Sequence, residues 1–209
     1  MVKRIFLLLI TAAATSTFIS NAYSQAVTHR KVLVMPREGS GDIELMVTKE
    51  LSVMISMLKS ARFEPVVASA SGKPFVGHAV TVKSDLKLTD VKVSDYLAVL
   101  VPCMAAGEPG PMPEEAIKIL ADVAAAGKPV AAPRGAIWML SQAGLLKGRK
   151  YAYLTPSFPE GVHSGNGVVQ DGNIITSAVC PFQASLSGLP DGTTELTQKV
   201  IALLAGGAR

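Results

Sequence analysis

Residues 127–150 (GKPVAAPRGAIWMLSQAGLLKGRK) constrain the fold of this chain more than any other stretch. The short apolar run Val130-Ala131-Ala132 follows a Gly-Lys-Pro turn and is typical of a buried strand. Pro133-Arg134-Gly135 interrupts that run, and apolar residues then recur at helical spacing from Ile137 until Gly144. A strand that turns sharply into a helix has the shape of a nucleophile elbow, which holds one side chain at the carboxyl end of a sheet beside backbone N–H groups.

The turn of this predicted elbow carries no nucleophile. Elbow chemistry needs a thiol or a hydroxyl, whereas residues 133–136 are Pro, Arg, Gly and Ala. Arg134 stays protonated at physiological pH and cannot attack a carbonyl group. We therefore expect the scaffold of an elbow from which the reactive atom has been removed.

The first 24 residues are typical of a secretory signal peptide. The basic pair Lys3-Arg4 precedes an apolar run at residues 5–10, and the small residues of Ala22-Tyr23-Ser24 suit a cleavage site. A single membrane anchor is the alternative, but the apolar run is short and no stop-transfer pattern follows it. No cysteine lies near the cut, which disfavours a lipoprotein. We expect a bacterial periplasmic or secreted protein with no stable membrane anchor after cleavage.

The mature chain, residues 25–209, is long enough for a single domain with its own core. Removal of residues 1–24 leaves 18 basic against 16 acidic residues, from 20 and 16 in the full chain, so the net charge falls to +2. No basic stripe with interleaved aromatic residues is present, and we expect no nucleic-acid binding. The three histidines do not have metal-ligand spacing, so we expect no metal and no cofactor.

Apolar runs and turn residues predict strands that alternate with helices. The predicted strands are residues 31–35, 63–68, 96–101, 130–132 and 151–154 and a hairpin at 168–176 around Asp171-Gly172, with helices after residue 41, from Pro113, from Ile137 and at 193–204. Residues 73–91 read as a small β excursion. This alternation predicts an α/β fold with a doubly wound, mostly parallel, flavodoxin-like sheet, in which ligands bind at the carboxyl ends of strands.

Six local strings occur in an order that points to a known family. They are KVLVM (31–35), GDIEL (41–45), DYLAVLVP (95–102), GKPVA (127–131), AGLLKGRK (143–150) and DGNIITS (171–177). Together the strings resemble the ThiJ/PfpI (DJ-one) superfamily, within the class I glutamine amidotransferase-like fold. The resemblance implies that fold over almost the whole mature chain, and a homodimer.

The same resemblance assigns positions at the site. Family enzymes carry a reactive cysteine at the elbow, often followed by histidine, and the ungapped match places Arg134 and Gly135 there. A shift of one residue would place Pro133 at the cysteine position instead. The family glutamate that hydrogen-bonds the cysteine falls at Glu44, and the loop whose amides help to form the oxyanion hole falls at Pro102-Cys103-Met104.

Two pairings are possible at this site, the second because Cys103 and Cys180 follow strands expected to end at the same crevice. Arg134 could form an ion pair with Glu44 or present its charge to an anionic ligand, and the alternative is that Arg134 points to solvent. Cys103 and Cys180 could form a disulfide or a redox-responsive pair, and the alternative is two separate small buried residues. The candidate ligand pocket therefore comprises Glu44, Cys103, Met104, Arg134, Gly135 and Cys180.

Two functions are compatible with the sequence. The first is a periplasmic ThiJ/PfpI-like protein that has lost cysteine-dependent catalysis and binds a small ligand or a protein partner. The second is a PfpI-type hydrolase or lyase (a peptidase, amidase, glyoxalase or deglycase-like enzyme) that uses Cys103 or a water held by Glu44. A thiol or hydroxyl within reach of Glu44 would favour the second function.

Overall fold

The computed structural model describes residues 30–107 and 113–206, so the predicted signal peptide lies outside the described residues. The strands are β1 (Lys31–Val34), β2 (Glu64–Ser69), β3 (Phe75–Val76), β4 (Thr81–Val82), β5 (Leu86–Lys87), β6 (Ala98–Leu100), β7 (Val130–Pro133), β8 (Lys150–Tyr151), β9 (Val162–His163), β10 (Val168–Asp171) and β11 (Ile174–Ser177). The helices are α2 (Ile43–Met46), a π-helical turn (Val47–Leu51), α3 (Ser52–Ser60), α4 (Glu114–Ala125), α5 (Ile137–Gln142), α6 (Pro181–Ser187) and α7 (Thr193–Gly206), with 3-10 turns at Leu88–Asp90, Val93–Asp95 and Arg134–Ala136. Within these described residues, no helix is long and apolar enough to cross a lipid bilayer.

Seven strands form one sheet in the order β10-β11-β7-β6-β1-β2-β5. Neighbouring strands are parallel except β10 and β11, which form an antiparallel hairpin. The chain runs from β1 to β2 on one side and later returns to β6 on the other, so the topological switch lies between β1 and β6. The predicted mostly parallel, flavodoxin-like sheet is confirmed, and the loops after β1 and β6 border the crevice where such sheets bind ligands.

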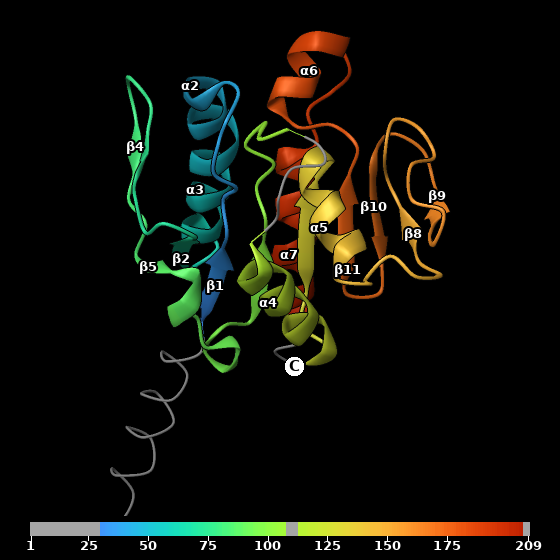
Figure 1. Ribbon diagram of the computed structural model, residues 1–209, viewed down its shortest axis with the longest axis horizontal. Coiled ribbons are helices and arrows are strands. Elements are labelled where there is room, and N and C mark those ends of the chain that lie inside the picture. The colour runs from blue at the N-terminus through green and yellow to red at the C-terminus, as the bar shows by residue number, and fades with distance from the viewer. Residues whose placement is uncertain (1–29, 108–112, 207–209) are drawn as a thin grey trace, which may run out of the picture.

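Different helices cover the two faces of this sheet. In Figure 1, α4 and α5 lie in front of the sheet and α7 lies behind it. Val32 and Val34 of β1 pack in the cluster that contains α3 and α7, whereas Leu33 and Met35 pack in the cluster that contains α4 and α5. Successive strand residues point to opposite faces, so a strand covered on both sides is apolar at every position.

The predicted β excursion in residues 73–91 is present. β3 and β4 form a short antiparallel hairpin. β5 then pairs in parallel with β2 and becomes the edge strand of the main sheet. The excursion therefore extends the sheet as well as forming a hairpin, which the sequence pattern did not predict.

The predicted hairpin near the end of the chain is also present, but its loop lies one residue further on. Asp171 pairs with Ile174 inside the ladder, so Gly172 and Asn173 form the two-residue loop. Gly172 has φ 60°, a left-handed conformation that glycine adopts without steric cost. The register of the two strands is thus set by Gly172 as the first residue of the loop.

Candidate functional site at the carboxyl ends of β6 and β7

The turn after β7 has the backbone of an elbow with Arg134 at its tip. Arg134 has φ 41°, while Pro133 is extended at φ −94° and ψ 150°. A left-handed conformation is uncommon for a residue other than glycine and is found at functional sites. Of the two positions proposed for the tip, Arg134 rather than Pro133 has the left-handed backbone.

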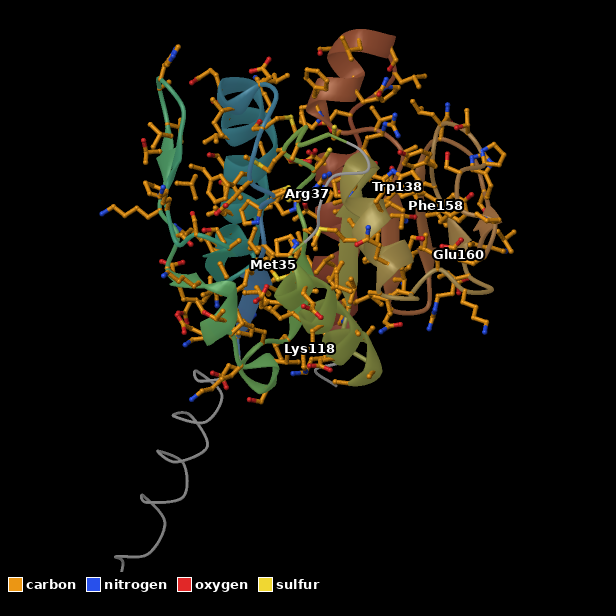
Figure 2. All side chains as sticks on the ribbon, in the orientation of Figure 1. Met35, Arg37, Lys118, Trp138, Phe158 and Glu160 are labelled. Atoms are coloured by element: carbon orange, nitrogen blue, oxygen red, sulfur yellow. The ribbon has the colours of Figure 1, made fainter. Side chains whose placement is uncertain are left out.

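The Arg134 side chain extends toward α6 and the segment after β8. Its Nε donates to Oε1 of Gln183 at 3.2 Å, and its guanidinium carbon lies 4.4 Å from the centre of the Tyr153 ring. Trp138 of α5 and Phe158 complete the aromatic cluster: their ring centroids are 4.8 Å apart, and Figure 2 shows the two side chains close together. A cation over an aromatic face is attracted by the ring quadrupole, so this cluster holds the guanidinium in place.

Glu44 does not form the proposed ion pair with Arg134. Its Oε1 accepts from the Thr48 hydroxyl at 3.3 Å, and its Oε2 accepts from the backbone N–H of His78. Because α2 packs against β3, the carboxylate of Glu44 faces the β3–β4 hairpin. Neither hydrogen bond of Glu44 involves a thiol; its hydroxyl partner, Thr48, lies one helical turn further along the same helical segment.

A carboxyl group that the sequence did not single out lies at the site. Glu50 is fully buried, and its two oxygens accept from the backbone N–H groups of Cys103 at 3.1 Å and Met104 at 2.9 Å. Burial, followed by the neighbouring Cys103, raises the pKa of Glu50 well above its usual value, although the two N–H groups oppose the shift. The amides that the resemblance assigned to an oxyanion hole therefore donate to Glu50.

One signal in the sequence could have identified Glu50. It lies in the π-helical turn between Val47 and Leu51, both fully buried, so it is an acidic residue on an apolar helix face. Glutamate is rarely buried unless it is paired or hydrogen-bonded. Turns of π-helix also occur frequently at functional sites.

The sulfur of Cys103 lies beside the elbow although it comes from the loop after β6. A hydrogen bond from the Cys180 thiol, then the backbone N–H groups of Ala105 and Gly135 and the charge of Arg37, lower the pKa of Cys103 to about 7, against the effect of burial. Gly135 directly follows the elbow tip. The structure thus brings together a sulfur and an elbow amide from two neighbouring strands.

The loop that carries Cys103 has an unusual backbone. Met104 and Ala105 follow it with φ 55° and 49°, so two consecutive residues other than glycine are left-handed. Each such residue costs about 1–2 kcal/mol relative to the right-handed conformation. Met104 is fully buried, and its N–H bond to Glu50 helps to hold this strained turn.

Cys180 is the partner of Cys103. It is the N-cap residue of α6, a short helix that was not predicted and that begins with Pro181. The hydrogen bond to Cys103, followed by burial, raises the pKa of Cys180. Both cysteines are free thiols, so the predicted disulfide is not formed, whereas the proximity that it required is present.

A cavity of about 250 Å³ opens at this thiol pair. The residues that line it include Cys103, Ala105, Arg134, Gly135, Cys180 and Gln183. Four of the six predicted pocket residues therefore line one cavity, while Glu44 and Met104 are not among its lining residues. In residues 30–107 and 113–206, no group of three or more His, Cys, Asp or Glu residues could hold a metal ion.

A doubly wound, mostly parallel sheet whose switch-point loops converge on an elbow defines a flavodoxin-like α/β protein. The family model that matches the chain is the DJ-1/PfpI family, over residues 30–185. The chain belongs to the DJ-1/PfpI family. Among the curated proteins compared with the chain, none matches.

Solved structures agree with this assignment. A two-domain protein from Anabaena variabilis with DJ-1/ThiJ/PfpI-like and ferritin-like domains is 22% identical with a TM-score of 0.63, and the match covers 86% of this chain and 49% of that one. This chain therefore spans about half the length of that protein. A ThiJ/PfpI domain protein from Brachyspira murdochii is 16% identical, with a TM-score of 0.63 and coverage of 86% and 98%. Oxidised DJ-1 from Toxoplasma gondii is 26% identical, with a TM-score of 0.57 and coverage of 84% and 97%.

Proposed function

We propose that this protein is a periplasmic member of the family that has lost the elbow-cysteine mechanism and works as a redox-active dithiol. Cys103 is the reactive thiolate and Cys180 is the thiol that resolves its oxidised form. The observation that carries the proposal is the position of the Cys103 sulfur, which accepts hydrogen bonds from the Cys180 thiol and from the elbow amide of Gly135.

The two thiols have complementary properties for this chemistry. A thiolate is the nucleophile, and the lowered pKa of Cys103, about 7, increases its thiolate fraction at neutral pH above that of an ordinary cysteine. The raised pKa of Cys180 keeps its proton, which stabilises the neighbouring thiolate. Such an asymmetric pair attacks with one sulfur and resolves with the other.

The co-reactant is a hydroperoxide. The Cys103 thiolate attacks the terminal oxygen, an S–O bond forms, the O–O bond breaks, and the leaving alkoxide takes a proton from water. Cys180 sulfur then attacks Cys103 sulfur, the S–S bond forms, and the leaving hydroxide takes the Cys180 proton to give water. In sum, one hydroperoxide and two thiols give one alcohol, one disulfide and one water.

The direct test counts thiols after the reduced protein reacts with one equivalent of hydrogen peroxide. We expect the wild-type protein to lose both thiols and two hydrogens without gaining oxygen. Cys180→Ser should stop at a sulfenic acid on Cys103 that a dimedone probe captures, and Cys103→Ser should keep its thiol. Two titratable thiols in the wild-type protein, after free cysteine under the same conditions has reacted completely, would refute the proposal.

A hydrolase or lyase that uses Cys103 is the second candidate, and the cavity of about 250 Å³ between Cys103 and Arg134 favours it. This activity would need Cys103 but not Cys180 as a second sulfur. Methylglyoxal and peptide substrates therefore separate the two functions. Turnover that is retained in Cys180→Ala and lost in Cys103→Ala supports the second candidate.

Location and assembly are parts of the same proposal. A periplasmic location follows from the signal peptide predicted at residues 1–24, and an oxidising compartment permits a disulfide. A homodimer follows from the family resemblance. Cell fractionation and light scattering of the mature protein test these two points, and a cytoplasmic pool or a monomer would contradict them.

A further inference from the structure

A second cavity, of about 260 Å³, is lined in part by the loop after β1. Its walls include the apolar side chains of Met35, Leu88, Ala116 and Met139. Its polar residues are the neighbours Arg37 and Glu38. Figure 2 shows Met35 and Arg37 near the centre of the molecule, at the end of β1 that borders the switch point.

Arg37 carries a buried charge that is only partly satisfied. Its side chain is 8% exposed, and its Nη2 donates to the carbonyl oxygen of Gly107 at 2.6 Å. Nη1 is buried without a hydrogen-bond partner, and no carboxylate of the described residues forms an ion pair with this guanidinium. A buried charge normally requires a paired anion, so this arrangement points to a ligand that supplies one.

Glu38 does not supply the missing charge. One of its carboxylate oxygens accepts from the N–H of Ser71 at 2.9 Å and from its hydroxyl at 2.7 Å. Burial raises the pKa of Glu38 and the hydrogen bonds from Ser71 lower it. The net effect is a lowered pKa, so this residue remains an anion in the cavity wall. A negative wall disfavours ligands with two or more negative charges.

We propose that this cavity binds a small monocarboxylate with an apolar tail, whose carboxylate pairs with Arg37. A planar guanidinium with an open N–H group matches a carboxylate, and the methionine, leucine and alanine walls match a hydrocarbon tail. The anionic Glu38 selects against phosphate and dicarboxylates. Neither cysteine lines this cavity, so the proposal does not depend on the redox function, although the charge of Arg37 also lowers the pKa of Cys103.

The test is calorimetric titration of the mature protein at neutral pH with straight-chain carboxylates from acetate to decanoate. We expect affinity to rise with chain length until the cavity is filled and then to fall. The amide of the best acid should bind at least about tenfold more weakly, because it lacks the charge that pairs with Arg37. Phosphate and succinate should bind more weakly than the best monocarboxylate.

Two variants locate the site. Arg37→Met should abolish the preference for acid over amide, whereas Arg134→Met, which changes the other cavity, should keep it. If Arg37→Met fails to fold, Ala70→Leu fills the exposed mouth of the same cavity and should weaken binding of the best acid at least about tenfold. The proposal would be overturned by equal binding of acid and amide, by stronger binding of phosphate, or by absence of binding at any chain length. Unchanged binding in a folded Arg37→Met or Ala70→Leu protein would also overturn it.

Discussion

The turn after β7 and the loop after β6 lie at the same edge of the sheet and differ in what each provides. The turn after β7 has the elbow backbone, with Arg134 at φ 41° and a helix behind it, but no sulfur. The loop after β6 provides the sulfur of Cys103 without an elbow. Because neighbouring parallel strands end side by side, an atom from one strand can occupy a place beside the turn of the next. In this chain the elbow backbone and the sulfur beside it therefore come from two neighbouring strands.

Cys103→Ser tests this comparison with the largest expected effect. At neutral pH, iodoacetamide should label Cys103 in the reduced wild-type protein, because the pKa of this thiol is lowered. In the variant Cys180 loses the partner that raises its pKa but stays buried, so total labelling should fall at least about tenfold. Mass spectrometry of the labelled peptides measures both sites. Preferential labelling of Cys180 in the wild-type protein would mean that the loop after β6 is not the reactive one.

Glu50→Ala tests what holds the loop after β6. The substitution leaves the buried N–H groups of Cys103 and Met104 without their acceptor, at about 1–3 kcal/mol each. We expect the free energy of unfolding to fall by about 2–6 kcal/mol in urea titrations. Loss of less than about 1 kcal/mol would show that the two hydrogen bonds do not hold the strained turn.

Glu50→Gln is the matched control because it keeps one carbonyl acceptor. The same substitution removes the titratable group, so it also changes how stability depends on pH. The folded pKa of Glu50 is raised, so between the ordinary value of 4.5 and the raised value the folded protein holds a proton that the unfolded chain releases. Stability that this group contributes below pH 4.5 is therefore lost as the pH rises. The variant should show a flatter fall in stability above that pH, and an unchanged pH profile would contradict the assignment.

Cys180→Ala tests the pKa of Cys103. The hydrogen bond from the Cys180 thiol is the largest influence that lowers this pKa, so its removal should raise the midpoint from about 7 toward the ordinary value of about 8.5. The ultraviolet absorbance of the thiolate as a function of pH measures the midpoint. A midpoint that stays near 7 would assign the shift to the amides of Ala105 and Gly135 and to Arg37.

The sequence predicted the sheet and the elbow because both leave periodic or local signals. Val130-Ala131-Ala132 predicts a strand and Pro133-Arg134-Gly135 predicts a turn from local residues alone, without any knowledge of the tertiary contacts. Glu44 shows the limit of a resemblance, since a matched position does not fix the direction of a side chain. That carboxylate instead follows the packing of α2 on the β3–β4 hairpin.

The partners of other site residues could not be predicted, even where the apolar surroundings of Glu50 hint at its burial, because they depend on contacts between distant segments. Glu50 reaches the amides of Cys103 and Met104 across more than fifty residues, and no local pattern connects them. The low pKa of Cys103 likewise requires Cys180, which the seven-residue helix α6 brings to the site. A helix that short gives too few turns for a periodic pattern.

Glycine substitutions at the two strained turns give the smallest expected effect and sharpen the comparison. Ala105→Gly removes the cost of φ 49° and loses only a methyl group, so we expect a gain in stability of roughly 0.5–1 kcal/mol after the larger entropy of the unfolded glycine chain. Arg134→Gly also removes a left-handed side chain, but it loses the hydrogen bond to Gln183 and the contact with Tyr153. Its net change should therefore be near zero, as measured by thermal unfolding of both variants beside the wild-type protein. An equal gain in stability in both variants would mean that the contacts of Arg134 do not stabilise the elbow. Backbone strain would then be the main energetic feature of both turns.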